Sequence, residues 1–158
     1  MDTRHATIPL QAPAQPPAQP PAADLPERVE VAHAGGESYL ITVRGHTLVA
    51  GQPEQAGGDD AGATPTELFV ASLASCVAYY AGRFLSRHGA SREGLRVSAD
   101  FGLAADGPAR VAAVRLRVAA PGLPAERRPA FLAVISRCTV HNSLRRPPEV
   151  VVELAGDA

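Results

Sequence analysis

Two cysteines are the residues in this chain whose chemistry depends most on their surroundings. Cys76 falls within a long apolar run, and Cys138 begins the segment Cys138-Thr139-Val140-His141. A deprotonated cysteine is a nucleophile, whereas a thiol buried among apolar groups behaves as a small hydrophobic side chain. Position in the sequence leaves both roles open for each cysteine.

Other uses of these residues are less well supported by their spacing. A disulfide between Cys76 and Cys138 requires Cα atoms within about 7 Å, which a sequence cannot show. A zinc site would have to draw on both cysteines, His141 and His46, and the sequence has no Cys-x-x-Cys or paired histidines. We therefore expect no metal. His141 could act as a base, although a hydrogen-bonded surface histidine is the more common situation.

A helix over residues 65–88 must position Cys76. Thr64 and Glu67 form a capping box at its start, and Gly89 is a natural stop. Apolar residues recur at helical spacing around most of the circumference beside one polar stripe, which predicts a buried helix. Cys76 lies at the border between the apolar rows and the polar stripe, so its sulfur can face a small polar pocket.

The remaining segments predict strands and one further helix. The predicted order, βββ-α-ββ-α-β, has its strands arriving in hairpins and indicates an α+β fold with a largely antiparallel sheet. The second helix is expected to carry Cys138 at its C-terminal end, with residues 139–144 as a connection. Alternating apolar and polar residues predict strands at 28–31, 39–43, 46–50, 95–103, 114–118 and 150–154, and helical spacing predicts the second helix at 125–137.

Composition and charge restrict the class of protein. The 158 residues indicate one folded domain, 27–158, after a Pro/Ala/Gln-rich tail, 1–26, which we expect to be disordered. A net charge of −1 with scattered basic residues argues against a nucleic-acid surface. We expect no apolar run long enough to span a bilayer and no signal peptide, and hence a cytoplasmic protein whose cysteines are thiols.

Glycines, a proline and a glutamate accompany the two cysteines at characteristic positions. They are Gly57-Gly58-Asp59, Gly62, Pro65, Glu67-Leu68 and Cys76, followed by Cys138-Thr139-Val140-His141-Asn142-Ser143-Leu144. These residues, with the element order over residues 28–154, resemble the OsmC/Ohr family of thiol peroxidases, and in particular its OsmC-like branch. The resemblance implies an intertwined homodimer, with two long central helices between sheets and active sites at the subunit interface.

The same resemblance implies a role for each cysteine. Cys76 would be the peroxidatic thiolate, which attacks the O–O bond of an organic hydroperoxide and becomes a sulfenic acid, and Cys138 would resolve it to a disulfide. A dithiol, in this family typically protein-bound dihydrolipoamide, would then reduce the disulfide. No metal, flavin or other cofactor is implied.

The cation that would stabilise the Cys76 thiolate has no clear counterpart in this sequence. Better-studied family members carry an arginine in the first hairpin, whereas residues 32–38 contain none. Arg44, near the end of the second predicted strand, is our candidate, with Arg83 as a second one.

Glu67 is the candidate for the family's orienting glutamate, although Thr66 is the residue that directly follows the proline. Glu67 precedes Cys76 by nine residues, which places it half a turn around the helix and about 13 Å along it. The two cannot touch within one chain. Glu67 therefore either reaches the partner subunit's site or only completes the capping box.

Two other functions fit the same residues. In one, the protein is a redox-sensing or small-ligand-binding dimer on this scaffold, with poor turnover because the arginine is missing. In the other, it is a structural dimer with buried, inert cysteines. Peroxidase activity is the hypothesis that the two cysteine motifs favour.

Overall fold

The computed structural model describes residues 27–156 of the chain. The predicted tail, residues 1–26, lies outside the described residues, so its disorder stays a prediction. The described residues belong to two units, 27–148 and 149–156. All of the helices and strands described below lie in the first unit.

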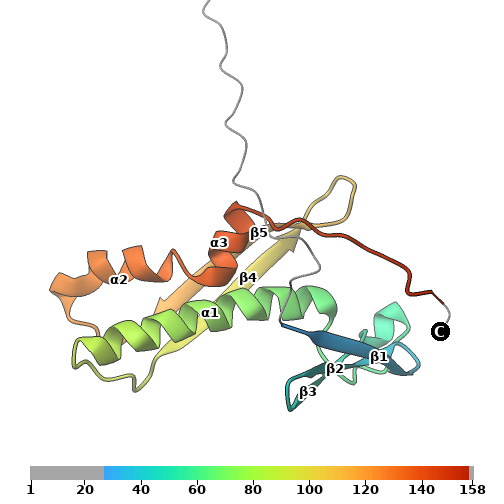
Figure 1. The fold of residues 1–158 in the computed structure, drawn as a ribbon. Coiled ribbons are helices and arrows are strands. Elements are labelled where there is room, and N and C mark those ends of the chain that lie inside the picture. The colour runs from blue at the N-terminus through green and yellow to red at the C-terminus, as the bar shows by residue number, and fades with distance from the viewer. Residues whose placement is uncertain (1–26, 157–158) are drawn as a thin grey trace, which may run out of the picture. The chain divides into compact units, whose positions relative to one another are not determined.

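The N-terminal strands form an antiparallel sheet in the order β1-β2-β3 (Figure 1). Its strands are β1 (Val29–Gly35), β2 (Ser38–Val43) and β3 (His46–Ala50). The three predicted strands are confirmed here. After them come a short 3-10 turn, η2 (Glu54–Ala56), and the glycine-rich loop that leads to the long helix.

An apolar row crosses this sheet and is left uncovered. The register places Val31 opposite Ile41, and Ile41 opposite Leu48. Val31 is 60% exposed and Leu48 is 45% exposed. Among the described residues no helix packs across this row, whereas the second sheet packs on α1. The sheet therefore presents apolar side chains that residues 27–156 leave exposed.

The turn between β2 and β3 has an unusual backbone. Val43 pairs with His46, so Arg44 and Gly45 form a two-residue hairpin loop. Arg44 has φ 55°, in the left-handed region. Tight hairpin turns need positive φ and usually place Asn, Asp or Gly there, because a side chain such as arginine costs about 1–2 kcal/mol in that conformation.

The long helix α1 (Pro65–Arg87) agrees with the prediction to within one residue. The amide of Thr64 donates to Glu67 Oε2 at 2.8 Å, and the amide of Glu67 donates to Thr64 Oγ1 at 3.2 Å. These two bonds are the predicted capping box. At the other end Gly89 has φ 66°, which lets the amide of Ala90 reach back to the carbonyl of Leu85.

Helix α1 is buried on one face rather than around most of its circumference. Its buried side chains are Val70, Leu73, Val77, Ala81, Phe84 and Leu85. All of them except Val70 belong to the core cluster shared with the second sheet and the two later helices. Its polar stripe and the apolar Phe69 beside it stay exposed. The prediction of a buried helix therefore holds for this face only, because the described residues supply packing partners for one side of α1.

The composition of α1 corrects a second expectation. An 18-residue window within it has a mean hydropathy of 1.4, which satisfies the length and composition criteria for a membrane span. The expectation that no apolar run is long enough was therefore wrong, because the leucines, valines and phenylalanines of α1 raise the average despite its serines. The apolar core helix of a soluble protein meets the same criteria, and 39% of this window is buried by the chain itself.

The second sheet and two short helices complete the core. Strands β4 (Arg96–Leu103) and β5 (Val111–Ala119) are antiparallel, as predicted, and α2 (Arg128–Ile135) follows the 3-10 turn η3 (Ala125–Arg127). The rings of Phe84 in α1 and Phe131 in α2 pack edge to face, with their centres 5.4 Å apart. Figure 1 shows α2 running alongside α1.

The structure corrects the predicted surroundings of Cys138. A separate helix, α3 (Thr139–Arg145), stands where the sequence indicated a connection. Cys138 is its N-cap residue, with an extended backbone at φ −67° and ψ 158°, rather than the end of the second helix. Ser136 and Arg137 form a turn between the two helices, because the chain must change direction there to keep Cys138 in the core.

The predicted last strand, residues 150–154, is not formed. Residues 149–156 have no regular secondary structure, and Val152 and Leu154 are 90% and 99% exposed. Alternation of side chains specifies two faces but supplies no hydrogen-bond partner, and no strand within the described residues pairs with this segment.

Candidate active site

Cys76 lies in the middle of α1, at the edge of the core. Its side chain is partly exposed and packs against the buried cluster. Leu73 and Val77, which precede and follow it on the helix, are both buried. The predicted border position is confirmed, but the cluster against which Cys76 packs is apolar rather than a small polar pocket.

Cys138 is fully buried, with 0% of its surface exposed. It belongs to the same core cluster as Leu73 and Val77 of α1. The backbone N–H groups of Val140 and His141, in the first turn of α3, are directed at its sulfur. Packing of α3 on α1 therefore places Cys138 against the helix that carries Cys76.

Neither cysteine is disulfide-bonded, and Cys76 packs against the cluster that contains Cys138. The pKa of the Cys138 thiol is raised, first because burial disfavours the thiolate and also because the Cys76 side chain hydrogen-bonds to it and repels its negative charge. The N–H groups of His141 and Val140 act in the opposite direction and do not outweigh burial. Cys138 is therefore a protonated thiol at neutral pH.

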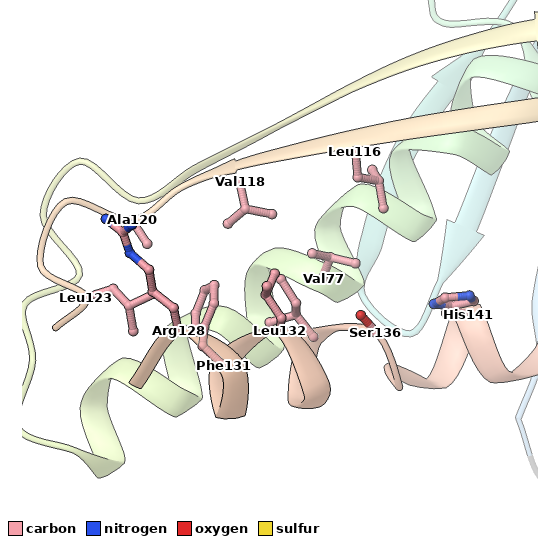
Figure 2. Close-up of a pocket in the computed structure, with 11 residues that line it drawn as sticks. Val77, Leu116, Val118, Ala120, Leu123, Arg128, Phe131, Leu132, Ser136 and His141 are labelled. Atoms are coloured by element: carbon pink, nitrogen blue, oxygen red, sulfur yellow. The ribbon is translucent and has the colours of Figure 1, made fainter. Parts of the chain in front are cut away.

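An apolar cavity of about 440 Å³ lies between α1, α2 and β5. Figure 2 shows Leu116 and Val118 of β5 facing Phe131 and Leu132 of α2 across it, with His141 of α3 at one end. A second cavity of about 380 Å³ lies along α1, β5 and α3 and shares Leu116 and His141 with the first. The two cavities offer apolar volume on both sides of His141.

His141 is thus more than the hydrogen-bonded surface residue that the sequence favoured. Its side chain is half-buried and lines both cavities, while its backbone amide faces the sulfur of Cys138. Within residues 27–156, no group of three or more His, Cys, Asp or Glu side chains is arranged to hold a metal ion.

Glu67 and Arg44 do not meet the cysteines within one chain. Oxygen Oε2 of Glu67 accepts bonds from the amide and the hydroxyl of Thr64, which lower the pKa of its carboxyl group. Its other oxygen, Oε1, has no recorded hydrogen bond in the described part of the chain, so the capping role leaves one oxygen available. Arg44 lies in the β2–β3 turn, a part of the fold that does not pack on α1.

Arg83, the second candidate cation, is engaged elsewhere. Its Nη1 donates to the hydroxyl of Tyr79 at 3.3 Å, and its guanidinium lies 5.5 Å from the centre of the same ring. Both side chains lie on the exposed face of α1. Across residues 27–156, no arginine has a recorded contact with Cys76.

Sequence reasoning missed one contact beside the cysteines. The hydroxyl of Tyr80, one helical turn after Cys76, lies 3.2 Å from Oγ1 of Thr139, the residue after Cys138. The available signal was a hydroxyl-bearing residue four positions after Cys76 and another directly after Cys138. Because the two are 59 residues apart, only the fold could show that they meet.

The loop glycines shared with the resembled family have a packing role. A Cβ on Gly58 would collide with the carbonyl of Gln52, and a Cβ on Gly62 would collide with that of Val49. Asp59 accepts a hydrogen bond of 3.1 Å from Ser38 of β2, whose side chain is buried. These residues fasten the loop before α1 to the first sheet.

We predict that the two thiols differ sharply in reactivity. At pH 8, iodoacetamide should modify Cys76 of the native reduced protein at least about tenfold faster than Cys138, because burial and a raised pKa make the Cys138 thiolate scarce. Peptide mass mapping over a time course measures both rates. In denaturant the two rates should converge, and equal rates in the native protein would show that Cys138 is not shielded.

Comparison with known protein families matches residues 57–153 to the OsmC-like proteins. No protein of curated function matches the sequence. A Psychrobacter arcticus protein described as an osmotic stress induced and detoxification response protein has a similar structure, with TM-score 0.67 and 22% identity over 73% of this chain and 85% of its own.

Two organic hydroperoxide resistance proteins also have similar structures. OsmC of Legionella pneumophila is 20% identical over 77% of this chain and 92% of its own, with TM-score 0.58. OhrB of Bacillus subtilis is 19% identical over 76% of this chain and 92% of its own, with TM-score 0.55. Identities this low show a shared fold, and the family match covers both cysteines and most of the folded chain. The chain therefore belongs to the OsmC-like protein family.

Proposed function

We propose that this protein is a cysteine-based peroxidase that reduces organic hydroperoxides. The observation that carries the proposal is the packing of a partly exposed Cys76 against the core cluster that contains the buried Cys138. An accessible thiol next to a shielded one is the arrangement that a two-step thiol reaction needs. Family membership and the names of the related hydroperoxide resistance proteins support the same reading.

The reaction follows from the two thiols. The Cys76 thiolate attacks the outer oxygen of the hydroperoxide, the O–O bond breaks, and the alkoxide takes a proton to leave as an alcohol. Cys76 is now a sulfenic acid. Cys138 loses its proton and attacks the Cys76 sulfur, an S–S bond forms, the S–O bond breaks, and the hydroxide leaves as water. A dithiol then reduces the disulfide and is itself oxidised.

The apolar cavities support an organic substrate rather than hydrogen peroxide. Both are lined mainly by aliphatic and aromatic side chains, and Leu73 and Val77, the neighbours of Cys76 on α1, line one each. An alkyl group gains free energy by leaving water for such a surface, whereas hydrogen peroxide has no apolar group to bury.

In a homodimer, the partner chain would supply the remaining residues of the site. The uncovered row of Val31, Ile41 and Leu48 is the kind of surface that a second copy buries. Arg44 and Glu67, which do not reach the cysteines of their own chain, would then serve those of the partner. Strained backbone such as that of Arg44 is concentrated at functional sites, which supports its assignment as the activating cation.

The reductant and the compartment complete the proposal. A lipoyl dithiol suits a disulfide between two cysteines of one chain, because its second thiol displaces the first mixed disulfide without a second collision. A cytoplasmic location would keep both thiols reduced between turnovers.

We predict that one equivalent of tert-butyl hydroperoxide removes two free thiols from the wild-type protein. The intact mass should fall by two hydrogen atoms as the Cys76–Cys138 disulfide forms. The Cys138→Ser variant should instead gain one oxygen atom at Cys76, which dimedone traps as a sulfenic acid. Two unreacted thiols after prolonged exposure would refute the peroxidase and leave a structural dimer.

Turnover separates the enzyme from the alternative, a redox-sensing or small-ligand-binding dimer. That alternative is favoured by the absence of a recorded arginine contact to Cys76 in residues 27–156. Repeated consumption of hydroperoxide in the presence of reduced lipoamide supports the enzyme, whereas one oxidation per chain followed by no further consumption supports the sensor.

We predict that Glu67 acts across the dimer interface. Glu67→Gln keeps the capping box but removes the charge. Refolded mixtures of Glu67→Gln and Cys76→Ser chains should regain up to half of the wild-type peroxidase rate per heterodimer, although each homodimer is weak or inactive. Mixtures of Cys76→Ser and Cys138→Ser chains should regain nothing, because both thiols of a site come from one chain. Absence of recovery in the first mixture would assign Glu67 to capping alone.

We predict that Arg44→Asn makes the fold more stable and slows the oxidation of Cys76. Asparagine tolerates the left-handed backbone better, so the free energy of unfolding should rise by up to about 1 kcal/mol. Loss of the cation should slow the oxidation of Cys76 about tenfold, because the thiolate loses its stabilising charge.

Urea unfolding and stopped-flow oxidation measure these two effects of Arg44→Asn. Arg28→Asn is the matched control, since Arg28 is an exposed arginine beside the same sheet and pairs with Glu30 at 2.7 Å. It makes the same charge change and should alter neither quantity appreciably. Unchanged oxidation in Arg44→Asn would remove Arg44 from the site.

A further inference from the structure

The hydrogen bond between Tyr80 and Thr139 lies where the two cysteine-bearing elements meet. Tyr80 follows Cys76 by four residues, so the two side chains share one face of α1. Thr139 directly follows Cys138 and is the first residue of α3. The 3.2 Å contact between their hydroxyl oxygens therefore joins α1 to α3 within one helical turn of each sulfur.

Other recorded hydrogen bonds of α3 are local. The amide of Asn142 donates to the carbonyl of Cys138 at 2.9 Å, and its side chain donates to the carbonyl of Arg137 at 3.1 Å. Ser143 donates to the carbonyl of Thr139 at 3.1 Å. These bonds shape α3 without attaching it to another element. Among the described residues, the Tyr80–Thr139 bond is the recorded hydrogen bond between α3 and α1.

We propose that Tyr80 and Thr139 are positioning residues for the resolving step, in which Cys138 attacks oxidised Cys76. The inference rests on the proposed function and adds residues that neither bind substrate nor react. Helix α3 has seven residues and is separated from α2 by the turn at Ser136 and Arg137. A helix this short is not held in position by its own stability. The side-chain bond adds a directional attachment to the apolar packing of α3 on α1.

The resolving step is the part of the cycle most sensitive to this attachment. The first oxidation needs only Cys76 and the hydroperoxide. The second needs the Cys138 sulfur in line with the S–O bond of the sulfenic acid, and misplacement by about 1 Å can slow such a step by orders of magnitude. The added oxygen on Cys76 also crowds the space that the two thiols share, and the bond resists outward movement of α3.

The test separates the two steps of oxidation. Tyr80→Phe and Thr139→Val each remove one hydroxyl and nearly preserve side-chain volume, whereas Thr139→Ser retains the hydroxyl. Tyr79→Phe is the matched control, because the Tyr79 hydroxyl lies beside Arg83 on the exposed face of α1. Disulfide formation is followed by rapid acid quench and mass spectrometry after one equivalent of tert-butyl hydroperoxide. Sulfenic acid formation is measured in the Cys138→Ser background.

We predict that Tyr80→Phe and Thr139→Val slow disulfide formation about fivefold or more, the effect of losing one hydrogen bond. Sulfenic acid formation should be unchanged in both. Thr139→Ser should restore the wild-type rate, and Tyr79→Phe should match wild type throughout. A general loss of structure would instead slow both steps and would not depend on the hydroxyl. Disulfide formation at the wild-type rate in both variants would overturn the inference.

A second measurement keeps this inference distinct from the peroxidase itself. An aromatic disulfide, 4,4′-dithiodipyridine, reacts with Cys76 to give a mixed disulfide and one pyridinethione, and attack by Cys138 then closes the protein disulfide and releases a second pyridinethione. Slow release of the second in Tyr80→Phe supports the positioning role even if hydroperoxide leaves Cys76 untouched, an outcome that would refute only the proposed function. Unchanged second release would overturn the positioning role even in an active peroxidase.

Discussion

Burial of Cys138 against α1 is the interaction on which the candidate site depends. Cys138 is at once a fully buried member of the core and the N-cap of α3. The apolar packing that holds α2 and α3 on α1 thus brings its sulfur to Cys76. The same burial keeps Cys138 protonated and leaves Cys76 as the accessible partner, so core formation and the division of labour between the thiols have one physical origin.

The rest of the molecule divides into a part that packs well and a part that does not. Helix α1, the second sheet and the two short helices bury a shared core, whereas the first sheet keeps an apolar row exposed. The reactive pair lies in the packed part. The charged residues proposed to act on it, Arg44 and Glu67, are exposed in this chain. Chemistry and assembly are therefore coupled in the proposed dimer.

Local signals allowed much of this fold to be predicted from the sequence. Thr64 and Glu67 fixed the start of α1 because a capping box involves residues only three apart, and alternation located five strands. The turn that ends α2 and the separate helix α3 could not be foreseen. Cysteine is not a preferred N-cap residue, and the turn serves the burial of Cys138. Residues 150–154 have the pattern of a strand, but a strand also needs a neighbour, which the pattern does not contain.

The candidate site divides in the same way. The resemblance identified Cys76 and Cys138, and spacing alone showed that Glu67 cannot reach Cys76 in its own chain. The contact of Tyr80 with Thr139 and the position of His141 between two cavities depend on elements far apart in the sequence. Residue spacing within a helix does not contain that information.

The separation of the two cysteines along the chain has an energetic consequence. They stand about sixty residues apart and meet only because the protein folds. On a chain-entropy argument, a cross-link that closes a loop of this length restricts the unfolded chain by about 4 kcal/mol. Folding and disulfide formation are two sides of one thermodynamic cycle, so folding favours formation of the disulfide by the same free energy. The oxidised protein would therefore be the more resistant to unfolding, and its reductant must overcome the fold's preference for the closed loop.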